Sequence, residues 1–185
     1  LDLVFLIDRS GSMYGSEEDT IGGFNSFIEK ERKNELKTNV TTILFDDKYE
    51  VLYKRKSIMD VKKLTKEEYF VRGTTALLDA IGKTINTLDK EIDNKVLFVI
   101  MTDGMENSSR EFTKDQISNL INNHNWEFIY IGADIDSDGG KSDYDLGGGL
   151  DVFPFPSEKS AVFAEIDRLR ELIKNGKELT GGWKK

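Results

Sequence analysis

The chain has 185 residues and is acidic, with 34 Asp and Glu residues against 26 Lys and Arg residues and a net charge of −8. Proteins that bind nucleic acid need a basic face, so this balance argues against a nucleic-acid partner. The sequence contains no cysteine, which excludes disulfides, thiolate catalysis and zinc–thiolate sites.

Hydrophobic patterns predict strands and helices that alternate along the chain. Strands are indicated by short runs that are continuously apolar or rich in β-branched residues, and helices by apolar residues three and four positions apart. The predicted strands cover residues 3–7, 40–45, 49–53, 95–101, 126–131 and 151–153, and the predicted helices cover residues 16–33, 76–92, 111–122 and 157–174.

This order is typical of an α/β fold that is doubly wound, with a mostly parallel central sheet, helices on both faces and one antiparallel edge strand. The antiparallel strand is expected at 49–53, because only a tight turn separates it from the strand before. We expect a single, monomeric domain over residues 1–185, with residues 176–185 as a tail.

No apolar run reaches transmembrane length, so we expect no insertion into a membrane. The absence of cysteine favours a cytoplasmic location. Because the chain opens inside its first predicted strand, we expect a trimmed N-terminus, and this leaves secretion open.

Asp8, Ser10 and Ser12 come directly after the first predicted strand. They place one carboxylate and two hydroxyls at one edge of the sheet. Oxygen ligands of this kind suit a hard divalent cation, Mg2+ or Mn2+, rather than zinc. The alternative is that the two serines only cap the helix that follows.

Two further oxygen-bearing residues lie at corresponding places downstream. Thr75 directly precedes the predicted helix 76–92, and Asp103 follows the predicted strand 95–101. In an open parallel sheet, ligands bind beyond the carboxyl ends of the strands. Because Asp8 and Asp103 both follow strands, we expect both side chains at that edge. We expect Thr75 to join them there from a loop.

The three segments together resemble a von Willebrand factor type A domain, also called an integrin I-like domain. The resemblance covers the chain from Leu1 to about Asp134. It is carried by the run Asp-Arg-Ser-Gly-Ser-Met that begins at Asp8, by Gly-Thr-Thr-Ala-Leu-Leu around Thr75, and by Thr-Asp-Gly around Asp103. The compact domain, the absence of cysteine and the short loops are most similar to bacterial or phage members of the family.

The resemblance implies a metal-ion-dependent adhesion site (MIDAS) with Asp8, Ser10, Ser12, Thr75 and Asp103 as ligands. In that family the bound Mg2+ accepts an oxygen from an Asp or Glu of a partner protein. A metal-dependent protein-binding module is therefore expected, rather than an enzyme. Two alternatives stay open: a structural or regulatory subunit whose metal only stabilises the fold, and a Mg2+-dependent hydrolase.

Neighbouring residues are candidates for tuning this site. Arg9 occupies the variable position of the motif, and we expect it to point toward solvent, where it can pair with an acid of the partner. Three residues that follow Asp103 are also expected within reach of the site: Glu106, Asn107 and Ser108.

A second acidic loop partly matches the Ca2+ loop of an EF-hand. Asp134, Asp136 and Asp138 occupy its first, third and fifth positions, and a glycine follows at the sixth. The twelfth position holds Asp145 instead of the usual Glu, and the loop follows a strand rather than a helix. We therefore keep two interpretations, a Ca2+ site and a solvated acidic loop.

Overall fold

The computed structural model describes residues 1–33, 37–103, 105–132 and 150–154, together with residues 168, 171 and 175. Its six-stranded sheet has the order β3-β2-β1-β4-β5-β6. The strands are β1 (Asp2–Asp8), β2 (Asn39–Phe45), β3 (Tyr49–Ser57), β4 (Val96–Thr102), β5 (Glu127–Gly132) and β6 (Leu150–Pro154). Only the pair β2–β3 is antiparallel, so the predicted mixed sheet with an antiparallel edge strand is confirmed.

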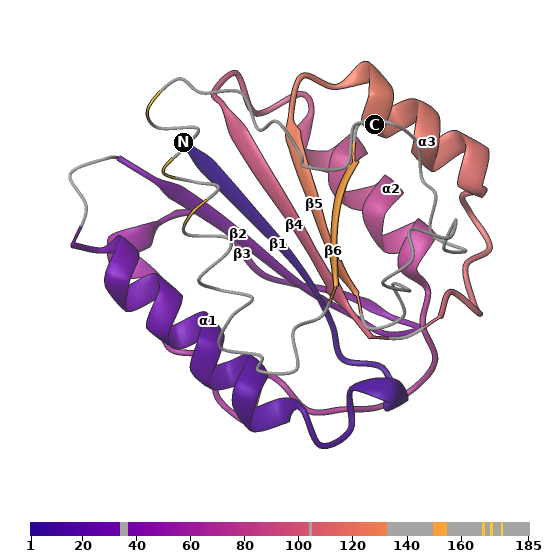
Figure 1. Cartoon of the computed structure of the whole chain (residues 1–185), viewed down its shortest axis with the longest axis horizontal. Coiled ribbons are helices and arrows are strands. Elements are labelled where there is room, and N and C mark those ends of the chain that lie inside the picture. Colours follow the sequence, from indigo (N-terminus) through magenta and orange to yellow (C-terminus); the bar gives the residue numbers. More distant parts are fainter. Residues whose placement is uncertain are drawn as a thin grey trace.

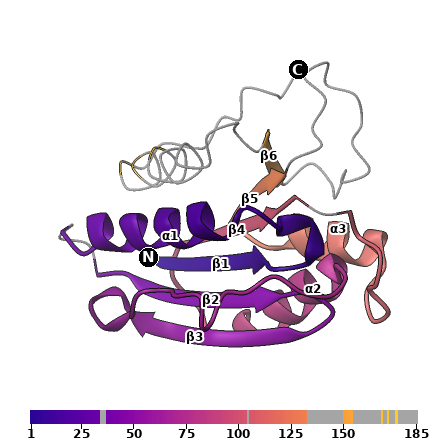
Figure 2. The same cartoon turned by 90° about the horizontal axis from the view of Figure 1, so that it is seen from below.

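Helices cover both faces of the sheet, as Figures 1 and 2 show. They are α1 (Glu17–Glu31), α2 (Leu77–Leu88) and α3 (Lys114–Asn123), with short 3-10 turns η1 (Gly11–Met13) and η2 (Ile58–Asp60). Strand β1 is buried on both sides and its residues alternate between two cores. The odd positions pack with α1, and the even positions pack with α2 and α3.

Aromatic packing fixes α1 against β1. The Phe5 ring meets Phe24 and Phe27 edge-to-face, with ring centroids 5.5 and 5.4 Å apart. Each such pair contributes about 0.5–1.5 kcal/mol beyond the area that it buries. These contacts pack the second half of α1 against the middle of β1.

The structure corrects three predicted boundaries. Helix α2 ends at Leu88 rather than at residue 92. Strand β3 extends to Ser57, because it continues to pair with β2 beyond irregularities in the register. Helix α3 begins at Lys114 rather than at residue 111. Thr113 is its N-cap, in a reciprocal capping box with Gln116. The predicted helix 157–174 and the acidic loop 134–145 lie outside the described residues, apart from residues 168 and 171.

The order of strands reverses between β1 and β4, which are parallel neighbours. Chain order runs from β1 toward β2 on one side and from β4 toward β5 on the other. At such a switch point the connections leave in opposite directions and open a crevice at the carboxyl edge. Asp8 ends β1 and Asp103 follows β4, so both predicted acids lie at this crevice.

Candidate metal site

Three hydroxyls meet at the carboxyl edge of the sheet. The Ser10 and Ser12 Oγ atoms are 3.1 Å apart, and Thr75 Oγ1 donates a hydrogen bond of 2.8 Å to Ser10 Oγ. Ser10 and Thr75 are buried, whereas Ser12 is exposed. The structure thus brings together residues 65 positions apart in the chain, as the sequence predicted.

The alternative role of the serines as helix caps finds no support in these contacts. Ser10 precedes η1 and makes no side-chain cap hydrogen bond, and the residue before α1 is Ser16. The Ser10 hydroxyl is instead directed at the other hydroxyls of the cluster. These contacts place the Ser10 side chain in the hydroxyl cluster and not at a helix cap.

Asp8 is fully buried beside this cluster. One carboxylate oxygen accepts a hydrogen bond of 2.6 Å from the Ser10 backbone N–H, and the other accepts one of 2.5 Å from the Thr102 hydroxyl. Burial raises the pKa of Asp8 to about 6, because desolvation outweighs these hydrogen bonds, and the charge of Asp103 raises it further. Asp8 is therefore a carboxylate whose charge is poorly compensated by the protein alone.

Asp103 supplies a second carboxylate to the same place. Its Oδ1 atom is buried and has no hydrogen-bond partner. A buried, unpartnered carboxylate oxygen is costly unless a cation or a donor meets it. Asp103 directly follows Thr102, whose hydroxyl donates to Asp8, so the two acids lie at the same edge of the sheet.

The set of two carboxylates and three hydroxyls fits a hard divalent cation. Mg2+ is bound through oxygens, and one or two carboxylates with several waters are its usual complement in proteins. Among the described residues, no group of three or more His, Cys, Asp or Glu side chains could hold a metal. Asp8, Ser10, Ser12, Thr75 and Asp103 could hold a cation that prefers a mixed hydroxyl and carboxylate shell.

The segment after Asp103 fastens Thr75 in place. Asn107 Oδ1 accepts a hydrogen bond of 2.9 Å from Thr75 N–H, and the N–H groups of Asn107 and Ser108 donate to the Thr75 carbonyl at 3.1 and 3.2 Å. Glu106, also expected near the site, instead accepts backbone hydrogen bonds from Leu78 and Ser108 and so caps the start of α2.

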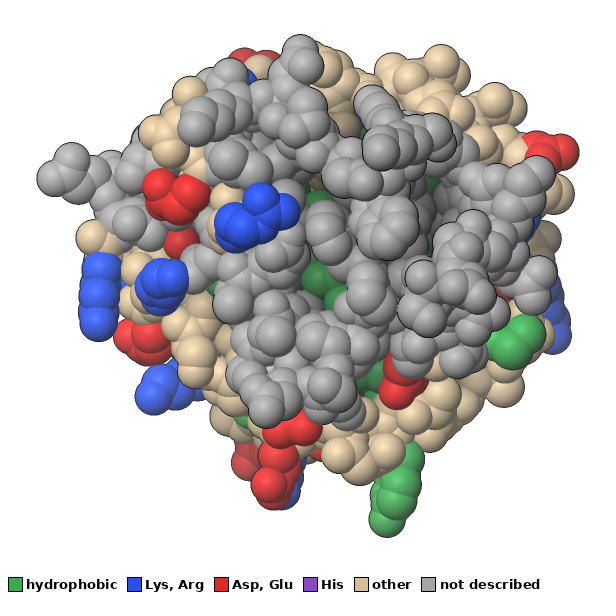
Figure 3. Space-filling model, in the orientation of Figure 1, with side chains coloured by type: hydrophobic (Ala, Val, Ile, Leu, Met, Phe, Trp, Pro, Cys, Tyr) green, Lys and Arg blue, Asp and Glu red, His purple; other side chains and the backbone are tan. Residues whose placement is uncertain are grey.

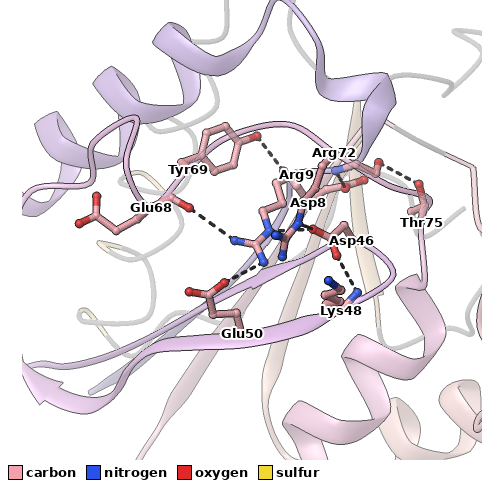
Figure 4. A network of polar contacts seen from close by, with 10 residues as sticks. Asp8, Arg9, Asp46, Lys48, Glu50, Glu68, Tyr69, Arg72 and Thr75 are labelled. Atoms are coloured by element: carbon pink, nitrogen blue, oxygen red, sulfur yellow. Dashed lines mark hydrogen bonds and ion pairs between the residues drawn. The ribbon is translucent and has the colours of Figure 1, made fainter.

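The expectation that Arg9 points toward solvent is wrong. Its side chain is completely buried and forms ion pairs with Asp46 at 2.9 Å and with Glu50 at 2.8 Å (Figure 4). The reason is that the hairpin of β2 and β3 places the buried carboxylate of Asp46 beneath the loop that follows β1, called the first loop below. Two acids at the predicted hairpin turn, Asp46 and Asp47, were the available signal for this contact.

Exposed hydrophobic side chains occur on the chain segments that carry the candidate ligands. Tyr14, Phe70 and Met105 are 84%, 42% and 58% exposed, and each comes from a segment that also carries a candidate ligand. An open cavity of about 660 Å3 lies beside Tyr14 and Phe70, with acids from the start of α1 on its wall. At the lower edge of Figure 3, over the region where η1 and the start of α1 lie in Figure 1, an acidic group and a hydrophobic side chain both project from the surface.

Comparison with solved structures shows the same fold in distant proteins. A von Willebrand factor type A protein from Catenulispora acidiphila superposes with a TM-score of 0.60 at 15% identity, over 89% of this chain and 41% of that one. The ArnB paralog VWA2 from Sulfolobus acidocaldarius gives 0.59 at 22% identity, over 89% and 44%. Manganese-loaded TRAP protein from Plasmodium vivax gives 0.56 at 18% identity, over 88% and 71%.

This chain spans less than half the length of the first two of these proteins, and no curated protein matches it in sequence. Among the described residues, no helix combines the length and apolarity needed to span a membrane. The family profile of the von Willebrand factor type A domain matches residues 2–146. With its fold and most of its length accounted for in this way, the chain belongs to the von Willebrand factor type A family.

Proposed function

We propose that this domain is a divalent-metal-dependent protein-binding module. Mg2+ or Mn2+, held by Asp8, Ser10, Ser12, Thr75 and Asp103, would coordinate an Asp or Glu carboxylate of a partner protein. The observation that carries this proposal is the meeting of three hydroxyls with a buried Asp8 and an unpartnered oxygen of Asp103.

Charge explains why such a site suits a carboxylate ligand. A bound Mg2+ supplies a Lewis-acidic position that can accept one more oxygen. Asp8 and Asp103 provide at most two negative charges and the three hydroxyls provide none, so the ligand shell does not over-neutralise the ion. Without the metal this acidic edge would repel a partner carboxylate, and a cation reverses the local sign.

The surface around the site supports binding of a protein rather than a purely structural metal. Tyr, Phe and Met are enriched at protein interfaces, and Tyr14 and Phe70 line the same open cavity. Tyr14, Phe70 and Met105 supply such side chains on the three segments that carry the candidate ligands. A metal that only stabilised the fold would not require them.

The hydrolase alternative is disfavoured by the residues near the site. A phosphatase of the Asp-x-Asp type would need an acid where Ser10 stands. The single histidine, His124, ends α3 just before β5, where it contacts the Leu120 carbonyl and Asp89. That position is at the amino edge of the sheet, away from Asp8, so we propose no catalytic role for the chain.

Domains of this family commonly mediate protein interactions, and the similar TRAP structure holds manganese. These two facts motivate one experiment that tests whether the metal binds and whether a carboxylate binds to it. Mn2+ bound to chelator-stripped protein would enhance water-proton relaxation, and added glutarate would lower that enhancement by displacing bound water. The matched control is Asp8→Asn, which should show no enhancement. Enhancement that glutarate leaves unchanged would refute binding of a carboxylate at the metal.

A further inference from the structure

Arg9 lies between Asp8 and Ser10, yet its side chain takes no part in the candidate ligand set. Its guanidinium contacts Asp46 and Glu50 through ion pairs, and Nη1 donates to the Glu68 carbonyl at 3.4 Å. As Figure 4 shows, these partners come from the β2–β3 hairpin and from the segment that leads to Thr75. A buried charge with partners on two other segments ties the first loop to both.

Asp46 is the junction of these contacts. Its Oδ2 atom accepts hydrogen bonds from Arg9 Nε at 2.9 Å and from Arg72 Nε at 2.7 Å. Its backbone carbonyl accepts one of 3.0 Å from Ala76 N–H, directly after Thr75. Burial raises the pKa of Asp46, but the donors Arg72, Lys48 and Arg9 outweigh it and hold that pKa below its ordinary value. Asp46 is therefore ionised at neutral pH.

Backbone hydrogen bonds also join the first loop to the segment before Thr75. Arg72 N–H donates to the Arg9 carbonyl at 2.8 Å, and Gly11 N–H donates to the Gly73 carbonyl at 3.2 Å. The guanidinium groups of Arg9 and Arg72 also lie over the Phe70 ring, 5.5 and 5.1 Å from its centroid. The first loop and the segment before Thr75 are thus held together along several residues.

Stability alone is a poor explanation for a fully buried ion pair. Desolvation of two charges offsets much of their attraction, and apolar replacements of similar volume are often neutral or stabilising. A role in positioning the site is the better explanation for the Arg9–Asp46 pair. The pair links the chain beside Ser10 to the chain beside Thr75, and the hydroxyls of these two residues are 2.8 Å apart. Arg9 adjoins Ser10, and Asp46 bonds the residue next to Thr75.

We propose that the Arg9–Asp46 pair is a positioning device that sets the spacing of the Ser10 and Thr75 hydroxyls and so selects Mg2+ over Ca2+. The proposal rests on the metal-binding function proposed above. Mg2+ requires near-octahedral oxygens at about 2.0–2.1 Å, whereas Ca2+ accepts flexible shells at about 2.3–2.6 Å. A site whose loops are tied closely together suits the smaller ion, and loosening them should penalise Mg2+ more than Ca2+.

The test compares Arg9→Met with Arg55→Met. Arg55 also pairs with a buried aspartate, Asp2 at the start of β1, where its Nε lies 3.0 Å from Asp2 Oδ1 and far from the candidate ligands at the other end of that strand. Calorimetric titration of chelator-stripped protein gives the dissociation constants for Mg2+ and Ca2+. We expect Arg9→Met to lower Mg2+ affinity by about tenfold or more, the usual effect of losing residues that orient metal ligands, and to lower Ca2+ affinity less, so that the preference for Mg2+ falls. Arg55→Met should leave the preference unchanged.

A second readout needs no metal. Amide hydrogen exchange of Gly11 and Arg72 reports the two backbone contacts between the loops. We expect faster exchange at both in metal-free Arg9→Met and no change in Arg55→Met. A merely structural role would lower the melting temperature without changing the ratio of the two affinities.

The outcomes separate this inference from the proposed function. No Mg2+ binding by the wild type would refute the metal site, and unchanged exchange in Arg9→Met would refute the tie between the loops. Mg2+ binding with an unaltered preference in Arg9→Met would overturn the positioning role. If Arg9→Met does not fold, Asp46→Asn removes the charge at constant shape, and the same loss of preference and protection is expected there.

Discussion

Replacing Asp8 by Asn should stabilise the metal-free protein. Asp8 is completely buried and ends β1 among hydroxyl groups. An amide at this position can still accept the Ser10 N–H, and it can donate to the Thr102 hydroxyl where the carboxylate now accepts. The substitution therefore removes the charge while both polar contacts are retained.

The magnitude follows from the pKa of Asp8, which burial raises from 3.8 to about 6. A shift of roughly two pKa units corresponds to about 3 kcal/mol. Since the folded pKa exceeds the unfolded one, the folded state binds more protons between these values. The stability that protonated Asp8 contributes is fully present below pH 3.8 and is lost as the pH rises through about 6.

At pH 7.5 in chelator, we expect Asp8→Asn to have a free energy of unfolding higher than the wild type by up to about 3 kcal/mol. Urea unfolding monitored by circular dichroism measures this difference. It should shrink as the pH falls from 6 to 4, because the wild type then becomes protonated. Added Mg2+ should stabilise the wild type alone. A metal-free Asp8→Asn that is less stable than the wild type at pH 7.5 would refute the reasoning.

Three further predictions concern other parts of the chain. Asp79 accepts hydrogen bonds from the backbone N–H groups of residues 110–112 at 2.8–3.0 Å. Asp79→Ala should therefore lower the free energy of unfolding by roughly 2–4 kcal/mol. Urea unfolding measures this change, with Asp79→Asn as the control variant. Asp134→Asn with Asp136→Asn should leave Mg2+ affinity unchanged by calorimetry, and a loss would mean that the two loops form one site. Tyr14→Ser should alter stability by less than about 0.5 kcal/mol and leave Mg2+ affinity intact, and a weaker Mg2+ affinity would show that Tyr14 supports the metal itself.

Much of the fold could be predicted because its signals are local. The run before Asp8 is apolar without interruption, which is typical of a strand buried on both faces, and the structure confirms this for β1. The motif around Asp8 and the Thr-Asp-Gly run around Asp103 both follow such strands. Parallel strands place their carboxyl ends together, so the edge on which these residues meet followed from their spacing.

What could not be predicted depends on contacts between distant segments. The burial of Arg9 depends on Asp46, 37 positions away, and a charged residue in a loop motif is by default expected in solvent. The start of α3 is set at Thr113 by its capping box with Gln116, and Asp79 of α2 binds the N–H groups of residues 110–112 just before it. Neither partner is signalled by hydrophobic periodicity.

The central claim is that this edge of the sheet binds a divalent cation, and isothermal titration calorimetry tests it most directly. Chelator-stripped wild type and Asp8→Asn would each be titrated with Mg2+ and with Mn2+. The variant is expected to be more stable than the metal-free wild type, so unfolding would not account for a loss of metal binding in it. We predict one binding event per chain in the wild type and none in the variant. No binding in the wild type, or equal binding by both proteins, would contradict the account.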